Sequence, residues 1–134
     1  MSAPASIATE MVLEQSVLSA SPEQLIDMVM DHVLLHLSLA SASSSKAWAE
    51  VQSHLHKAQR GILVLQGSLA LPGQRGQTGA SQKFSADLKQ LYSFMISSLV
   101  DADSRQDLSV IPGVLKVMGN ISSGWKQGVM RQGA

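Results

Sequence analysis

The chain of 134 residues contains no cysteine, and only 4% of its residues are aromatic. The absence of cysteine excludes a disulfide framework and a thiolate nucleophile or ligand, and it fits a protein of a reducing cytosol. With so few aromatic residues, a core must be built mainly from Leu, Val, Ile, Met and Ala. Because 45% of the residues are hydrophobic, the chain has enough apolar material for one compact domain.

The chain also lacks an excess of either charge and any long hydrophobic run. Ten Lys and Arg residues balance ten Asp and Glu residues. Such a chain gains little from attraction to phosphates, so we expect neither nucleic acid nor an anionic membrane surface as a partner. The longest apolar stretch, 33–40, is far short of the roughly 20 residues that a membrane helix needs, so we expect no membrane insertion. Residues 1–9 lack the basic flank and apolar run of a secretion signal.

Four segments have the apolar spacing of helices. Ser21 is a typical N-cap, Pro22 suits the first helical position, and Gln24 completes a capping box. These residues predict that a helix over 22–40 begins here. The second helix is predicted over 46–71 and the third over 82–103, each with an apolar residue every three or four positions. The apolar residues of these two stripes are Val51, Leu55, Ala58, Ile62, Leu65 and Leu69, and then Phe84, Leu88, Leu91, Met95 and Ala102, with Ser98 or Leu99 between the last two.

The fourth helix is predicted between Asp107 and the glycines at the end of the chain. Pro112 falls near its start and would remove one backbone hydrogen bond, so we expect a late start or a kink. A polar connector over 41–45 and a flexible Gly- and Gln-rich loop over 72–81 separate the helices. The sequence therefore predicts an all-α, antiparallel four-helix bundle over 21–127. An N-terminal arm or short helix over 1–20 precedes it, and a flexible tail over 128–134 follows it.

Several apolar residues lie outside the stripes that a bundle would bury. The helix over 22–40 carries two apolar stripes, as expected of a helix that is covered or bound on a second side. Val64, Ile96, Val100 and Val117 point away from the stripes of their own helices. Scattered exposed apolar residues are normal, but several on neighbouring helices can form a partner groove. We predict that Val64, Ile96 and Val100, together with Met11, Val12 and Leu13 of the arm, form a partner-binding surface.

Motifs for catalysis or metal binding are weak. His32 and His36 lie four residues apart on one helical face, but no Glu or Cys is placed as an obvious third ligand. Half-buried, hydrogen-bonded histidines are the better interpretation. Asp101, Asp103 and Asp107 resemble the start of a calcium loop, but Gln106 and Pro112 stand where that loop needs Gly and Glu. Neither a phosphate loop nor a nucleophile elbow is present. We therefore expect no metal, no cofactor and no catalytic residue, although a metal-dependent enzyme using His32 and His36 remains a testable alternative.

Four segments resemble the flagellin export chaperone family, FliS, in order and spacing. They are SASPEQLI at residues 19–26, followed by Met28 and Asp31; HKAQRGI at 56–62, continuing to Leu65; LKQLYSFM at 88–95, followed by Leu99, Ala102 and Asp107; and Val114, Leu115 and Trp125 near the end. The third is similar to the most characteristic segment of the family. The resemblance spans about residues 19–127.

This resemblance implies a four-helix bundle in the bacterial cytosol that binds the disordered C-terminal segment of flagellin. Binding would prevent premature polymerisation and keep flagellin competent for flagellar type III secretion. Components of the export gate and a second copy of the chain are further candidate partners. The family often has tyrosines in its N-terminal arm, whereas the only tyrosine here is Tyr92. The alternatives are therefore a diverged relative that binds another flagellar protein, or a structural bundle that self-associates.

Overall fold

The computed structural model describes residues 20–42, 47–69 and 79–130. These residues form four α-helices and one short π-helical turn, with no strand among them. The elements are α2 (Pro22–Ala42), α3 (Trp48–Ser68), α4 (Gly79–Arg105), α5 (Ile111–Trp125) and η1 (Lys126–Met130). The predicted all-α bundle is confirmed. Of the other predicted segments, the arm up to residue 19, most of the 41–45 connector, and residues 72–78 and 131–134 lie outside the described part of the chain.

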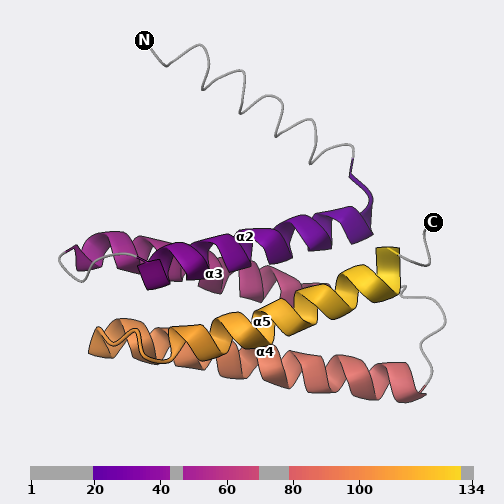
Figure 1. Cartoon of the computed structure of the whole chain (residues 1–134). Coiled ribbons are helices and arrows are strands. Elements are labelled where there is room, and N and C mark those ends of the chain that lie inside the picture. The colour runs from indigo at the N-terminus through magenta and orange to yellow at the C-terminus, as the bar shows by residue number, and fades with distance from the viewer. Residues whose placement is uncertain (1–19, 43–46, 70–78, 131–134) are drawn as a thin grey trace, which may run out of the picture.

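The four helices lie side by side and alternate in direction (Figure 1). Hydrogen bonds between α3 and α4 fix their antiparallel order, because Gln52 contacts Asp103 while Gln66 contacts Lys89. Helix α5 runs back along α2, where Lys126 Nζ lies 3.1 Å from Asp31 Oδ1 and 3.8 Å from Asp27 Oδ1. Helix α2 therefore packs between α3 and α5, which accounts for its two apolar stripes.

The start of α2 follows the predicted capping box. The Ser21 N–H donates to Gln24 Oε1 at 2.8 Å, and the Gln24 N–H donates to Ser21 Oγ at 3.2 Å. The two residues thus satisfy each other's backbone donors, which no helical hydrogen bond would satisfy. This local pattern explains why α2 begins at Pro22.

The end of α4 is set by a left-handed residue that is not glycine. Gln106 has φ 52°, the Gln106 N–H donates to the Asp103 carbonyl at 3.2 Å, and the Asp107 N–H donates to the Ala102 carbonyl at 3.0 Å. These two hydrogen bonds form a Schellman motif. Helix α5 then begins late, at Ile111, with Pro112 in its first turn, where a missing N–H removes no helical hydrogen bond. Of the late start and the kink expected near Pro112, the structure has the late start.

The core lies along the centre of the bundle and draws on all four α-helices. Its largest buried side chains include Met30 and Leu37 of α2, Leu55 and Ile62 of α3, Tyr92, Met95 and Leu99 of α4, and Ile111 and Met118 of α5. Burial raises the pKa of Tyr92 to about 12, so this ring stays neutral. Leu99 rather than Ser98 continues the stripe of α4, because Leu99 is buried and Ser98 only partly so.

The prediction that Phe84 belongs to the buried stripe of α4 is wrong, because its side chain is 68% exposed. In Figure 1, α5 leans away from the start of α4 toward α2. The ion pairs of Lys126 with Asp27 and Asp31 hold the end of α5 at α2. Among the described residues, fewer are therefore close enough to cover the first turns of α4.

Helices α2 and α3 approach each other closely at Gly61. A Cβ atom added to Gly61 would overlap Cγ2 of Val33, a core residue of α2. Any larger residue here would require the Val33 side chain or one of the two helices to shift. Gly61 therefore sets the spacing of the helix pair that also carries the pocket described next.

Candidate partner-binding site

The two edges of α3 face different neighbours. On one edge, Gln52 and Gln66 donate hydrogen bonds to α4. On the other edge, Gly61 meets α2, and Val64 stands next to the same helix. Leu63 and Val64 are adjacent in sequence and similarly exposed, at 53% and 58%, but only Val64 faces the groove toward α2.

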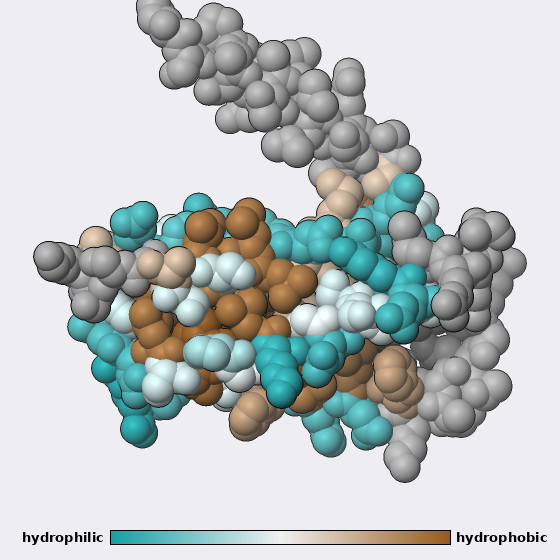
Figure 2. Space-filling view, in the orientation of Figure 1, coloured by the Kyte–Doolittle hydropathy of each residue, from teal (hydrophilic) through white to brown (hydrophobic). Residues whose placement is uncertain are grey.

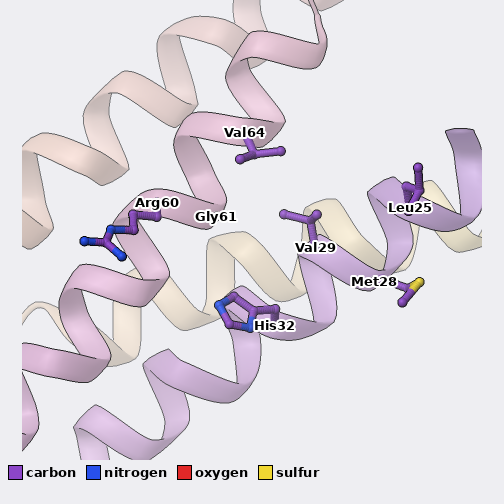
Figure 3. Close-up of a pocket in the computed structure, with 7 residues that line it drawn as sticks. All are labelled: Leu25, Met28, Val29, His32, Arg60, Gly61 and Val64. Carbon is purple, nitrogen blue, oxygen red and sulfur yellow. The ribbon is translucent and has the colours of Figure 1, made fainter. Parts of the chain in front are cut away.

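A surface pocket of about 320 Å³ lies between the first half of α2 and the second half of α3. Figure 3 shows the side chains of both helices around it. Helix α2 contributes Leu25, Met28, Val29 and His32, and α3 contributes Arg60, Gly61 and Val64. Most of this lining is aliphatic. The ionisable residues in it are His32 and Arg60, so the pocket offers an apolar floor with basic groups at its margin.

A second, polar depression adjoins this pocket along α3. Its lining includes Gln52, Ser53, His56 and Lys57, and it shares Arg60 with the apolar pocket. The structure gives neither Lys57 nor Arg60 an ion pair with another described residue. The outer face of α3 therefore carries two cationic side chains beside an apolar pocket.

Further apolar side chains remain exposed elsewhere in the described chain. They include Leu35 and Leu39 of α2, Phe94 and Val100 of α4, and Val110 just before α5. Figure 2 shows hydrophobic surface gathered over the second half of α2 and the first half of α5. By length and composition α2 could also cross a membrane, and it is the one described helix that could. Its packing against both α3 and α5 explains part of this apolar character.

The structure separates the residues that were predicted to form one partner surface. Val64 lines the α2–α3 pocket. Val100 is 51% exposed and follows Ser93 by seven positions, so it lies on the α4 face whose Ser93 Oγ bonds Gln66 of α3. Ile96 is partly buried and packs against the core. The arm residues Met11, Val12 and Leu13 lie outside the described residues. A partner role for each of the six stays a prediction.

The histidines form contacts between helices. His36 Nδ1 and His54 Nδ1 are 2.9 Å apart, which requires one ring to donate and the other to accept. His32 packs edge-on against His36 with ring centroids 4.4 Å apart. Burial, and then the neighbouring His32, His54 and Lys57, lower the pKa of His36. His54 of α3 thus completes a cluster with His32 and His36, although the sequence did not predict that it would meet them. Among the described residues, no group of three or more potential ligands is arranged to hold a metal ion.

Asp103 of α4 connects α3 to α4 through three hydrogen-bond partners. Its carboxylate accepts from Trp48 Nε1 at 3.2 Å and from Gln52 Nε2 at 2.9 Å, and it lies 3.1 Å from His56 Nε2. Burial alone would raise the pKa of Asp103, but the hydrogen bonds from His56, Gln52 and Trp48 outweigh it, so the pKa is lowered. Asp103, one of the three acids that resemble the start of a calcium loop, therefore serves to link two helices.

Comparison with known families decides the relationship of this chain. The model of the family described as "Flagellar protein FliS" matches residues 5–133. The chain belongs to the FliS family. The resemblance inferred from the four sequence segments is therefore confirmed. FliS relatives include the flagellar secretion chaperone FliS of Salmonella typhimurium, which is 29% identical over 115 residues, covering 86% of this chain and 82% of the relative.

Two further FliS relatives show similar identity over most of their length. The flagellar secretion chaperone FliS of Escherichia coli is 28% identical over 118 residues, covering 88% of this chain and 83% of the relative. The flagellar secretion chaperone FliSB of Pseudomonas aeruginosa is 29% identical over 115 residues, covering 84% of this chain and 85% of the relative. The family match over residues 5–133 includes both helices that line the pocket.

Sequence reasoning missed several exposed apolar residues of this FliS bundle. Phe94 lies within the characteristic LKQLYSFM segment and is 65% exposed, while its neighbours Tyr92 and Met95 are buried. The helical step of 100° per residue turns position 94 away from the stripe, so the spacing contained this information. Leu25, Met28 and Val29 have the spacing of an apolar stripe, but that they meet α3 in a pocket depends on the close approach at Gly61.

Proposed function

We propose that this chain is a cytosolic flagellar secretion chaperone that binds the disordered C-terminal segment of flagellin, prevents its premature polymerisation and keeps it competent for export. The observation that carries the proposal is the apolar α2–α3 pocket with the exposed Val64 at its edge, in a chain whose relatives are named flagellar secretion chaperones. The proposed mechanism is sequestration, and no catalytic step is part of it.

The pocket supports sequestration because of its chemistry. A disordered segment loses conformational entropy when it folds on binding, so it must bury apolar side chains to compensate. Leu25, Met28 and Val64 are partly or largely exposed in the free chain and offer such a surface. A segment docked here would hide its own apolar residues, which would otherwise drive polymerisation. The other exposed apolar residues, including Phe94 and Val100, would extend the contact for a long segment.

The test is calorimetric titration of the purified chain with the C-terminal peptide of the flagellin encoded by the same organism. We expect 1:1 binding with a large negative heat-capacity change, since coupled folding buries apolar surface. A Val64→Asp variant places a carboxylate at the pocket and should weaken binding by roughly tenfold or more, because burying a valine contributes about 1.5–3 kcal/mol.

The matched control is Leu63→Asp, which adds the same charge to a neighbouring residue of similar exposure outside the pocket. This variant should bind nearly as the natural chain does. If both variants lose binding equally, the pocket is not the specific site. Absence of binding by the natural chain removes flagellin as the partner and favours another flagellar protein, while self-association measured without peptide favours the structural bundle. Export-gate components, as further candidate partners, can be titrated in the same way.

A further inference from the structure

The apolar pocket and the polar depression beside it form one continuous strip on the outer face of α3. Arg60 lines both hollows, with Val64 one helical turn away on the apolar side and Lys57 on the polar side. At 1.5 Å per residue, Val64 lies roughly 6 Å along the helix from Arg60 and roughly 10 Å from Lys57. A segment lying along this strip would meet apolar surface first and cationic side chains within one to two turns.

The charge along the strip has one sign. Among the side chains that line the two hollows, the ionisable ones are His32, His56, Lys57 and Arg60. His56 is already engaged by Asp103 of α4. The acids of α2 that could neutralise the others, Asp27 and Asp31, pair with Lys126 on the α5 side of that helix. Lys57 and Arg60 are thus left as cations without an ion-pair partner among the described residues.

The two unpaired cations act only locally, because the chain as a whole is neutral. Ten basic and ten acidic residues give no overall attraction for an acidic partner. A local pair of unpaired cations next to an apolar pocket therefore acts only on a partner that is docked there. At the margin of an interface such charges select among partners and fix the register of binding more than they add affinity.

We propose that this strip recognises a segment in which an apolar anchor is followed, or preceded, by a carboxylate one to two helical turns away. The apolar side chain fills the α2–α3 pocket, and the carboxylate pairs with Arg60 or Lys57. This inference rests on the proposed function, because it specifies which part of the flagellin segment occupies the pocket. It adds that acidic residues of the segment, and not its apolar residues alone, decide where it docks.

The experiment compares two peptides and three proteins. The peptides are the flagellin C-terminal segment and the same segment with every Asp changed to Asn and every Glu to Gln. The proteins are the natural chain, Arg60→Glu and, as the charge-matched control, Lys116→Glu, which alters an exposed α5 residue that lines neither hollow. We expect Arg60→Glu to weaken binding of the natural peptide roughly three- to tenfold and Lys116→Glu to leave it unchanged.

Two readouts separate charge recognition from a structural effect. The amide peptide should bind the natural chain more weakly than the natural peptide does, and it should bind Arg60→Glu about as well as it binds the natural chain, because no carboxylate is left for residue 60 to attract or repel. Raising the salt concentration from about 0.1 M to about 1 M shortens the screening length from about 10 Å to about 3 Å. This should weaken binding of the natural peptide by the natural chain, and it should not weaken binding by Arg60→Glu, where salt screens the repulsion between two carboxylates.

The outcomes distinguish this inference from the function on which it rests. If the natural peptide binds but the amide peptide binds equally well, or if Arg60→Glu and Lys116→Glu behave alike, the proposed recognition of a carboxylate is wrong and the chaperone function stands. If the natural chain binds neither peptide, the flagellin partner itself is wrong, and this inference fails with it.

Discussion

At the scale of single residues, Gln106 is the one non-glycine residue with a positive φ in the described part of the chain. It holds φ 52° in the Schellman motif that ends α4. Glycine adopts this region without steric cost, whereas other residues lose about 1–2 kcal/mol there. Replacing Gln106 by glycine would remove this cost, but part of the gain in stability is offset because glycine has more conformational freedom in the unfolded chain. We expect Gln106→Gly to raise the free energy of unfolding by about 0.5–1 kcal/mol in urea titration.

Ser104 supplies the control for this prediction. It is exposed in the last turn of α4, two residues before Gln106. Ser104→Gly makes the same kind of change at a helical φ and should lower stability by a few tenths of a kcal/mol. Opposite signs for the two variants would identify the left-handed conformation as the cause. Equal losses in both would show that Gln106 carries no strain.

At the scale of elements, the spacing of α2 and α3 depends on Gly61. Helix propensity alone favours Ala over Gly by about 1 kcal/mol in a helix interior. At Gly61 the added methyl group would overlap Val33, so we expect Gly61→Ala to destabilise the bundle by about 1–3 kcal/mol instead. Gly67→Ala, in the same helix with nothing within 4 Å of its added Cβ, should be neutral or stabilising.

A double variant tests whether the overlap with Val33 is the cause. Val33→Ala alone opens a cavity in the core and lowers stability. In the presence of Val33→Ala, the added methyl group has room, so Gly61→Ala should cost less than it does in the natural chain. Chemical denaturation of the four proteins measures this coupling. If the two losses simply add, some other contact sets the helix spacing.

The elements themselves could largely be predicted from the sequence, because their signals are local. Ser21 and Gln24 lie within one turn and determine where α2 begins, and Pro112 suits the first turn of α5. The exposure of Phe84, in contrast, could not be predicted from its neighbours in sequence. Its exposure follows from the direction that α5 takes toward Asp27 and Asp31 of α2. The spacing along a helix predicts on which face of the helix a residue lies, but it does not predict whether another helix covers that face.

The candidate site shows the same limit at a larger scale. The spacing of Val64, Ile96 and Val100 predicts that each points away from the stripe of its helix, but it does not tell which neighbouring helix each would meet. Val64 lies toward α2, Val100 lies on the α4 face next to α3, and Ile96 packs against the core. The pocket exists because α2 and α3 meet at Gly61, and this contact joins residues that are about thirty positions apart in sequence.

At the scale of the whole molecule, we expect the histidine cluster between α2 and α3 to make stability depend on pH. The charged or titratable groups that act on His36 are His32 on α2 and His54 and Lys57 on α3, and all of them are basic. The folded chain therefore binds a proton at His36 less readily than the unfolded chain does. Stability from this group is fully present above its ordinary pKa of 6.5 and is lost as the pH falls through the lowered folded value.

We expect the free energy of unfolding to fall as the pH drops from about 7 into the mildly acidic range, with a slope of at most about 1.4 kcal/mol per pH unit for one proton. Asp103 does not contribute in this window, because its lowered pKa makes its stabilisation fail only at more acidic pH. A His36→Gln variant, less stable than the natural chain at neutral pH, should lose most of the pH dependence. Urea titrations at several pH values measure both proteins, and an unchanged slope in His36→Gln would place the acid-sensitive group elsewhere.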